Sequence, residues 1–452
     1  MTMLYRARWV LPISAAPIPE GAIVVQGEHI SAVGNYADLV ASFPEAPLRD
    51  FGEAAIIPGL INTHSHLELT AMRGFLETEE SDFFAWLRKL TIARLERMTP
   101  DDLYVSAAWG ACEAARAGIT CIGDASDAAT QSMKALRDTG LRGTVYQESF
   151  GPDPRLAGEN FEKLKSKVAG LRELETSRVR PGVSPHAPYT VCATQLEMIS
   201  EFAISEELPL MMHAAESTAE DLLLREGRGA FADNFAKRGI QWSTPGCSTV
   251  QYLAKHGILH AKPLLVHCIK VDDADIDTIK DSGAGVAHCP KSNAKLGHGR
   301  APFAKFIEAG IPLGLGSDSV ASNNTCDILE EARFATLFAR AEENADPGQR
   351  LASADQALRV ATLGGAKALG LASEIGTLER GQQADFIAVS LSGAHQQPVY
   401  DAATALVFAS AGRDVIMTAV AGREVYRDGR VTTVDEERLR GRMNEIAAKL
   451  RS

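Results

Sequence analysis

Six side chains able to bind a metal ion or move a proton follow short apolar runs in this chain. They are His64, His66, His213, Glu216, His267 and Asp318. The preceding runs span residues 60–63, 208–212, 264–266 and 312–316 and are typical of β-strands. In a barrel of parallel strands, the carboxyl ends of the strands form one catalytic face. We therefore predict that residues far apart in sequence meet in one pocket.

Four of these residues have the types and spacing of a metal site. His64 and His66 alternate along an extended segment, so both imidazoles can face one ion. His213 and Asp318, each at its own strand end, add a third nitrogen and a carboxylate oxygen. Such a set suits Zn²⁺ or Fe²⁺, with Mn²⁺ as a further alternative, and leaves a position for water. We predict a bound divalent ion, with Zn²⁺ as the first choice.

The two remaining residues are candidates for the catalytic chemistry. A bound divalent ion lowers the pKa of water toward ~7, and a nearby carboxylate can then take the proton and deliver it elsewhere. Glu216, one helical turn beyond His213, is suited to that role; its alternative is a structural carboxylate at a helix N-terminus. His267 can hold the hydroxide or polarise the bond under attack. A fifth ligand or a buried core histidine are the alternatives for His267.

The ends of the third and fourth predicted strands favour a single metal ion. Barrel hydrolases with two metal ions commonly bridge them through a carbamylated lysine there, whereas this chain has Glu148 and His186. Other metal motifs are absent from the sequence, including H-E-x-x-H and the H-x-E and P-C-x-x-C pair of zinc nucleobase deaminases.

The elements that position these residues alternate as βα units. Candidate strands are residues 60–64, 119–124, 143–148, 180–186, 208–213, 263–268, 285–289 and 311–318. Helical patterns lie between them, for example at residues 101–117, 128–139 and 272–282. Glycines 118, 140, 283 and 310 follow the ends of predicted helices. We predict an α/β fold, a (β/α)8 TIM barrel over residues 58–370. A doubly wound open sheet is the alternative, but no G-x-G-x-x-G follows the first strand.

Both ends of the chain supply short strands outside this pattern. They are residues 3–10, 22–25 and 30–33 at one end and 384–389, 416–420 and 423–426 at the other. Neither end has enough strands to bury a sheet alone. We predict that residues 1–57 and 371–435 pair into one small β-sandwich domain, and that residues 436–452 form a charged C-terminal helix that packs on the molecule.

Composition narrows the class of protein. The chain has 452 residues, and its 58 acidic against 46 basic side chains give a formal net charge of -12, so nucleic-acid binding is not expected. We find no signal peptide or membrane span, and the seven scattered cysteines fit reduced thiols. We expect a cytoplasmic protein that binds a small-molecule substrate and forms a homodimer.

Together, these motifs resemble the amidohydrolase superfamily, specifically its mononuclear deaminase and chlorohydrolase branch. The resemblance covers nearly the whole chain, and its matching stretches are residues 58–66 (PGLINTHSH), 184–189 (SPHAPY), 213–216 (HAAE), 288–293 (HCPKSN) and 316–324 (GSDSVASNN). It implies the ligand set and the proton carrier given above. It also implies that His267 and Asp318 orient the attacking hydroxide and that His186 reads a purine ring.

Departures from the family pattern concern the substrate. Deaminases of S-adenosylhomocysteine and methylthioadenosine usually carry a Pro-x-Glu after the tryptophan-containing helix, and its glutamate holds the ribose hydroxyls. After Trp86 this chain reads LRKLTIARLE, without that proline, and Glu96 is the available substitute. Residues 66–70 (HLELT), 83–86 (FFAW) and 146–151 (YQESFG) are instead similar to aminodeoxyfutalosine deaminases.

The resemblance implies a hydrolase of cyclic amidines that releases ammonia from a purine-type nucleoside, either 6-amino-6-deoxyfutalosine or an adenosine derivative. Alternatives are a deaminase of S-adenosylhomocysteine, methylthioadenosine, guanine or cytosine, and a triazine chlorohydrolase or amidohydrolase of the same fold. A non-catalytic barrel would lack ligands, and none is missing here. The candidate substrate contacts are His186, Glu68, Arg73, Trp86, Glu148 and His288.

Arg73, Trp86 and Phe84 each have two interpretations. Arg73 and Arg142 can clasp a substrate carboxylate through two hydrogen bonds, or Arg73 can form a salt bridge with a surface carboxylate. Trp86 and Phe84 can stack on a purine or pack in the core as residues of a helix face.

Overall fold

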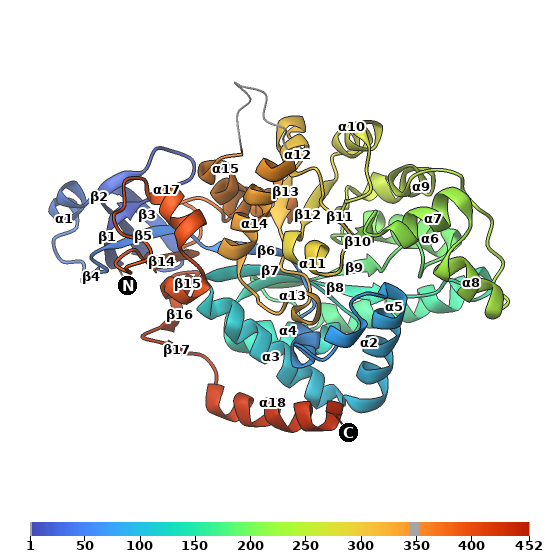
Figure 1. Cartoon of the computed structure of the whole chain (residues 1–452). Coiled ribbons are helices and arrows are strands. Elements are labelled where there is room, and N and C mark those ends of the chain that lie inside the picture. The colour runs from blue at the N-terminus through green and yellow to red at the C-terminus, as the bar shows by residue number, and fades with distance from the viewer. Residues whose placement is uncertain (1, 343–351, 452) are drawn as a thin grey trace.

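Eight parallel strands close into a barrel in the computed structural model, which describes residues 2–342 and 352–451 (Figure 1). The strands are β6 (Leu60–Ser65), β7 (Ile119–Ser126), β8 (Arg142–Ser149), β9 (Val179–Pro185), β10 (Met211–Ala214), β11 (Leu264–His267), β12 (Gly285–His288) and β13 (Leu313–Leu315). They pair in the order β10 to β13 and then β6 to β9, and a bridge between Val183 and Leu210 joins the two ends of that order. The predicted barrel is confirmed.

Helices between the strands cover the outside of the barrel. They include α3 (Pro100–Arg116), α4 (Ala129–Thr139), α5 (Ala157–Arg172), α6 (Ala193–Ser205), α9 (Thr249–Lys255), α10 (Asp273–Ser282), α12 (Phe303–Ala309), α14 (Ile328–Glu342), α15 (Ala354–Arg359) and α16 (Gly365–Ala368). Gly140 and Gly283 end α4 and α10 with φ values of 79° and 73°. Glycine adopts this left-handed backbone without steric cost, which explains why the predicted helix ends are correct.

Further helices follow the strands at the catalytic face. They are α2 (Phe83–Arg97) after β6, α7 (Thr218–Glu226) and α8 (Ala230–Lys237) after β10, α11 (Pro290–Lys295) after β12, and α13 (Val320–Asn323) after β13. Of these, α2 and α8 contact each other through Phe84 and Phe231, whose ring centroids are 5.9 Å apart. The two helices therefore stand together over one side of the barrel mouth.

The two ends of the chain build one β domain beside the barrel (Figure 1). Its strands are β1 (Thr2–Val10), β2 (Ile18–Gln26), β3 (His29–Asn35), β4 (Leu48–Asp50), β5 (Ala54–Pro58), β14 (Phe386–Ser390), β15 (Val415–Val420), β16 (Arg423–Arg427) and β17 (Arg430–Val431), with helices α1 (Tyr36–Ser42) and α17 (Ala402–Thr404). The N-terminal and C-terminal strands join where β5 pairs with β14. The turn at Gly422 lies against Gly27, so the sheet curls back over an apolar core that includes Ile23, Phe386 and Met417.

The predicted C-terminal packing helix is α18 (Glu436–Arg451), which runs along α3 (Figure 1). Lys449 and Arg442 of α18 donate hydrogen bonds to Asp102, which is fully buried at the start of α3. The boundaries predicted at residues 1 and 452 lie outside the described residues. Within the residues that the structure describes, no helix is long and apolar enough to cross a membrane.

Candidate active site

The four predicted ligands meet at the carboxyl ends of β6, β10 and β13. Oδ1 of Asp318 lies 3.4 Å from Nε2 of His64 and 3.7 Å from Nε2 of His66. The Nε2 atoms of His66 and His213 are 3.3 Å apart. Nε2 of His64 is buried without a hydrogen-bond partner. Because burying an unpaired polar atom is costly, an atom in this position indicates a missing ligand partner such as a metal ion.

The protonation states and hydrogen bonds of these four residues suit the binding of a divalent ion. Burial lowers the pKa of His66 to about 3, so its imidazole is neutral and has a lone pair for a metal. Nδ1 of His213 lies 2.9 Å from the carbonyl oxygen of His186, which directs Nε2 toward the other ligands. Oδ2 of Asp318 accepts hydrogen bonds from the hydroxyls of Ser292 and Ser322. These contacts orient the ligands before any ion binds.

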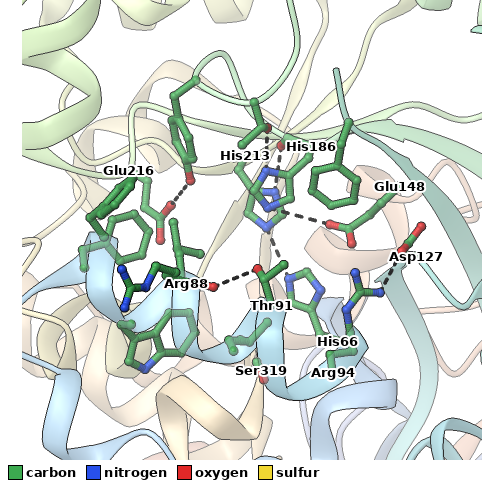
Figure 2. A pocket seen from close by; sticks show the side chains of 18 of the residues that line it. His66, Arg88, Thr91, Arg94, Asp127, Glu148, His186, His213, Glu216 and Ser319 are labelled. Carbon is green, nitrogen blue, oxygen red and sulfur yellow. Dashed lines mark hydrogen bonds and ion pairs between the residues drawn. The ribbon is translucent and has the colours of Figure 1, made fainter. Parts of the chain in front are cut away.

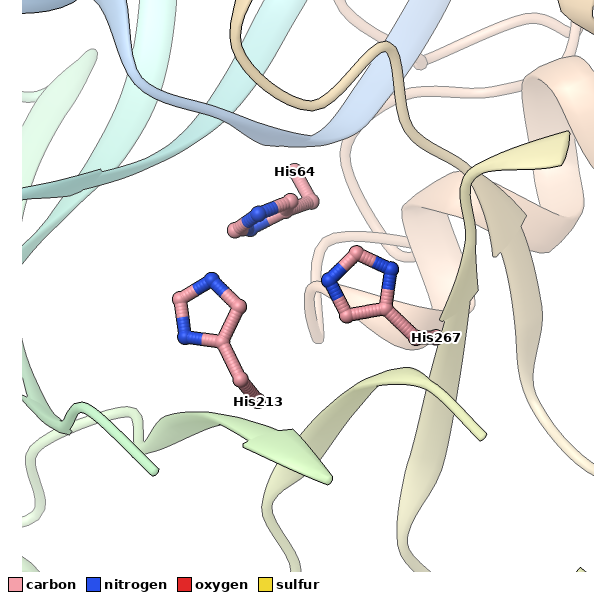
Figure 3. Close-up of side chains that lie close together, drawn as sticks. All are labelled: His64, His213 and His267. Atoms are coloured by element: carbon pink, nitrogen blue, oxygen red, sulfur yellow. The ribbon is translucent and has the colours of Figure 1, made fainter. Parts of the chain in front are cut away.

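Glu216 and His267 lie beside the ligand set. Figure 3 shows His267 facing His64 and His213, and their nearest ring nitrogens all lie within 4.8 Å of one another. Nε2 of His267 is 3.5 Å from Oε1 of Glu216, whose Oε2 accepts a hydrogen bond from Tyr189 at 3.3 Å. Burial raises the pKa of Glu216 to about 7. A carboxyl group with that pKa can both take and release a proton near neutral pH.

The ligand set forms the inner end of a cavity of about 620 Å³ (Figure 2). Polar residues line the cavity near the ligands, and they include Glu68, Asp127, Glu148 and His186. A mostly apolar wall is built by α2, α8 and the segment after β9, and it includes Phe84, Trp86, Leu87, Tyr189, Phe231 and Phe235. The volume falls in the usual range of about 300–1,000 Å³ for small-molecule sites.

Four of the predicted substrate contacts line this cavity, namely His186, Glu68, Trp86 and Glu148. Oε1 of Glu148 is buried without a hydrogen-bond partner and lies 4.0 Å from Nε2 of His186. Burial raises the pKa of Glu148 well above its usual value and lowers that of His186 to about 3. Burial thus disfavours the charged form of both groups, and the free Oε1 of Glu148 is available to bind a polar ligand. Trp86 is buried and also stacks on Phe83, so it has a core role as well.

The predictions for Arg73, Arg142 and His288 need correction, because none of the three lines the cavity. Arg73 forms an ion pair with Glu113, which was its alternative interpretation. Arg142 is buried at the amino end of β8 and pairs with Asp385. His288 is buried and packs on the ring of Phe303. Their partners come from distant parts of the chain, and local sequence does not indicate them.

Three further residues of the site have roles that we did not predict from the sequence. Arg94 of α2 donates a hydrogen bond to Asp127 at 2.8 Å and lies 3.3 Å from Glu68. Its guanidinium therefore forms ion pairs with both carboxylates. Oδ1 of Asn293 lies 2.9 Å from Nδ1 of His267 and orients that ring. Glu220 accepts hydrogen bonds from the backbone of the turn after β10. For Glu220 a signal existed, because Ser217-x-x-Glu220 has the spacing of a capping box.

Residues 55–425, which contain all of these side chains, match the family model described as Amidohydrolase family. The chain belongs to this family. A second, short match covers residues 21–46 and is to the Imidazolonepropionase-like composite domain of bacteria.

Similar proteins include deaminases. The chain is 31% identical to the 5-methylthioadenosine/S-adenosylhomocysteine deaminase of Moorella thermoacetica, over 95% of each chain. It is 32% identical to the protein of the same name from Symbiobacterium thermophilum, over 98% of this chain and 97% of that one. A zinc-bound adenosine deaminase structure from Xanthomonas campestris has a TM-score of 0.84 at 27% identity, over 99% and 98% of the two chains.

The family match and the site support the predicted enzyme class. The chain is a hydrolase that acts on carbon–nitrogen bonds of cyclic amidines, and it uses a divalent metal ion. An atrazine chlorohydrolase from Arthrobacter aurescens has the same fold, with a TM-score of 0.83 at 23% identity over 98% and 100% of the two chains.

Proposed function

We propose that this protein is a zinc-dependent deaminase of a 6-aminopurine nucleoside and that it binds one ion. The observation that carries the proposal is the position of Glu216, which is buried 3.5 Å from His267 at the inner end of the cavity. The names of the relatives and the zinc in the Xanthomonas structure support it.

In this proposal the residues of the chain divide the work of hydrolysis. A divalent ion held by His64, His66, His213 and Asp318 would supply the Lewis acidity that ionises water near neutral pH. Glu216 accepts one proton from the attacking water and delivers it to a ring nitrogen, which makes the neighbouring carbon electrophilic. It then takes the second proton from the oxygen that has added to the ring and passes it to the amine, which leaves as ammonia. His267, whose Nδ1–H donates to Oδ1 of Asn293, presents Nε2 as a hydrogen-bond acceptor that orients the attacking water.

As the specific substrate we propose 6-amino-6-deoxyfutalosine or a related adenosine derivative. Glu96, the substitute for the ribose-binding glutamate, is exposed and is not among the described residues that line the cavity. Leu95 lines the cavity in that region. The unpartnered Glu148 is a better acceptor or donor for sugar hydroxyls. S-adenosylhomocysteine and methylthioadenosine remain the second candidates, because the relatives carry those names.

Ammonia release from a panel of adenine nucleosides, guanine, cytosine and triazines tests the proposal. We expect the wild-type protein loaded with zinc to deaminate adenine nucleosides. Glu216→Gln should lower kcat by about 10²–10⁴-fold, the usual contribution of a proton carrier, while zinc content stays unchanged. Glu226→Gln on the exposed side of α7 is the matched control and should keep its activity. A Glu216→Gln protein with bound zinc and full turnover would contradict the role of Glu216.

A further inference from the structure

A second histidine lies beside the proton carrier, in the loop that follows α11. Nε2 of His298 is 3.7 Å from Oε1 of Glu216, and among the described residues it is buried without a hydrogen-bond partner. Glu216 is one of the described residues that line the cavity, whereas His298 is not. Because burying an unpaired polar atom is costly, a free ring nitrogen that faces a carboxylate indicates a contact that is completed in another state of the site.

The loop after α11 fixes the position of His298. The backbone N–H of His298 donates a hydrogen bond to the carbonyl oxygen of Asn293 at 2.9 Å. Since the side chain of Asn293 contacts His267, one residue holds both of the histidines that face Glu216. The ring of Phe83 meets the imidazole of His298 edge-on, with ring centroids 4.6 Å apart. Backbone and packing together therefore hold the ring of His298 beside the proton carrier.

Oε1 of Glu216 needs a hydrogen-bond donor when the carboxylate is ionised. Tyr189 donates to the other oxygen, Oε2, at 3.3 Å. Nε2 of His267 lies 3.5 Å from Oε1, but the Nδ1–H of that ring donates to Asn293, so Nε2 acts as an acceptor. Burial lowers the pKa of His298 to about 4, so its ring is neutral and carries one N–H. With that hydrogen on Nε2, His298 can donate to Oε1.

We propose that His298 is a positioning residue, which donates a hydrogen bond from Nε2–H to Oε1 of Glu216 during the reaction. The separation of 3.7 Å is slightly longer than a hydrogen bond, and contacts in active sites often shorten only when the substrate is bound. The hydrogen bond holds the carboxylate in the orientation in which it accepts a proton from water. His298 thus acts through Glu216 and does not touch the substrate. This inference rests on the proposed role of Glu216.

Two substitutions separate the hydrogen bond from packing. His298→Leu keeps an apolar contact with Phe83 and removes the donor. It should lower kcat by about 10–100-fold, the usual effect of losing a hydrogen bond to a charged group, while zinc content and KM for the best adenine nucleoside stay unchanged. His298→Gln places an amide N–H near the position of Nε2 and should recover most of kcat. His256→Leu is the control, because His256 contacts Glu197 at 2.8 Å and does not line the cavity.

A double-mutant cycle tests whether Glu216 is the partner of His298. If His298 acts through Glu216, His298→Leu should cost almost nothing further once Glu216→Gln has removed the proton carrier. A purely structural role of His298 would instead lower the rate by the same factor in both backgrounds. Urea unfolding of each zinc-loaded variant measures any loss of stability separately from the loss of kcat.

NMR of zinc-loaded protein with isotope-labelled histidines separates this inference from the deaminase proposal. The signals of His298, assigned by their absence in His298→Gln, should show a neutral ring with its hydrogen on Nε2 and should shift in Glu216→Gln. If they do so but no nucleoside is deaminated, the proposed function fails and the contact stands. The inference is overturned by hydrogen on Nδ1 of His298, by wild-type kcat in His298→Leu, or by an equal loss of rate with and without Glu216.

Discussion

At the scale of single residues, this site depends on buried side chains that are held in place by hydrogen bonds to specific neighbours. His213 is directed by the carbonyl of His186, Asp318 by two serine hydroxyls, and His267 by Asn293. The backbone of His267 has a φ of 74°, which a non-glycine residue adopts only when its surroundings fix it. The fixed orientation of these side chains, more than their residue types, therefore allows them to bind a metal ion and act in catalysis.

Removing the partner of His267 tests this view. Asn293→Ala should lower kcat by about 10–100-fold, the usual cost of losing an orienting contact, while metal content stays unchanged. Asn293→Asp keeps the acceptor oxygen and should recover most of kcat. Steady-state ammonia release and metal content per chain are the measurements. An alanine variant as fast as the wild type would show that Asn293 does not orient His267.

At the scale of elements, the connection from β10 to α7 is the critical one. It carries His213 at the end of the strand and Glu216 just before the helix, and Ala215 between them has a φ of 53°. Glu220 of α7 reaches back and accepts hydrogen bonds from the backbone N–H groups of Ala215 and Glu216, at 2.8 and 3.0 Å. The helix thus fixes the turn that positions the proton carrier.

Glu220→Ala should leave two buried N–H groups without an acceptor. Because each such group costs about 1–3 kcal/mol, we expect the free energy of unfolding to fall by about 2–6 kcal/mol. Glu220→Gln keeps one acceptor oxygen and should lose less. Urea unfolding of the metal-loaded protein measures both, with Asp221→Ala on the exposed side of α7 as the control. If Glu220→Ala and Asp221→Ala have the same stability, Glu220 does not hold the turn.

At the scale of the whole molecule, the barrel divides into a catalytic end and a stabilising end. The ligands lie at the carboxyl ends of the strands, whereas Arg142 lies at the amino end of β8. Its guanidinium pairs with Asp385, which precedes β14 and also accepts a hydrogen bond from the backbone of Ala421. Both charged side chains are almost fully buried. This pair ties the β domain to the barrel, away from the substrate.

Arg142→Met should therefore affect stability and leave catalysis intact. Removing one partner of a buried ion pair typically costs about 3–5 kcal/mol, because the other charge is left uncompensated. We expect a lower unfolding midpoint and an unchanged KM for the substrate at low temperature. The double variant Arg142→Met/Asp385→Asn should regain part of the stability. A specific rise in KM without loss of stability would instead place Arg142 in substrate binding.

Local sequence patterns were enough to predict the barrel, the β domain built from both ends of the chain and the residues of the metal site. Each ligand follows an apolar run, and the carboxyl ends of parallel strands lie together at one face of a barrel. Local patterns therefore predict which residues from distant parts of the sequence lie close together. The cap glycines also act locally, because left-handed backbone is a property of one residue.

Which arginines line the cavity depends on contacts that form only in the folded protein. Arg73, Arg88 and Arg142 are indistinguishable in sequence, and their roles depend on whether a carboxylate from another element reaches them. Glu113 reaches Arg73 and Asp385 reaches Arg142, whereas no acidic residue of the described chain pairs with Arg88. Charge compensation is set by contacts between distant elements, so the metal ligands were predictable from the sequence and the charged residues that line the rest of the cavity were not.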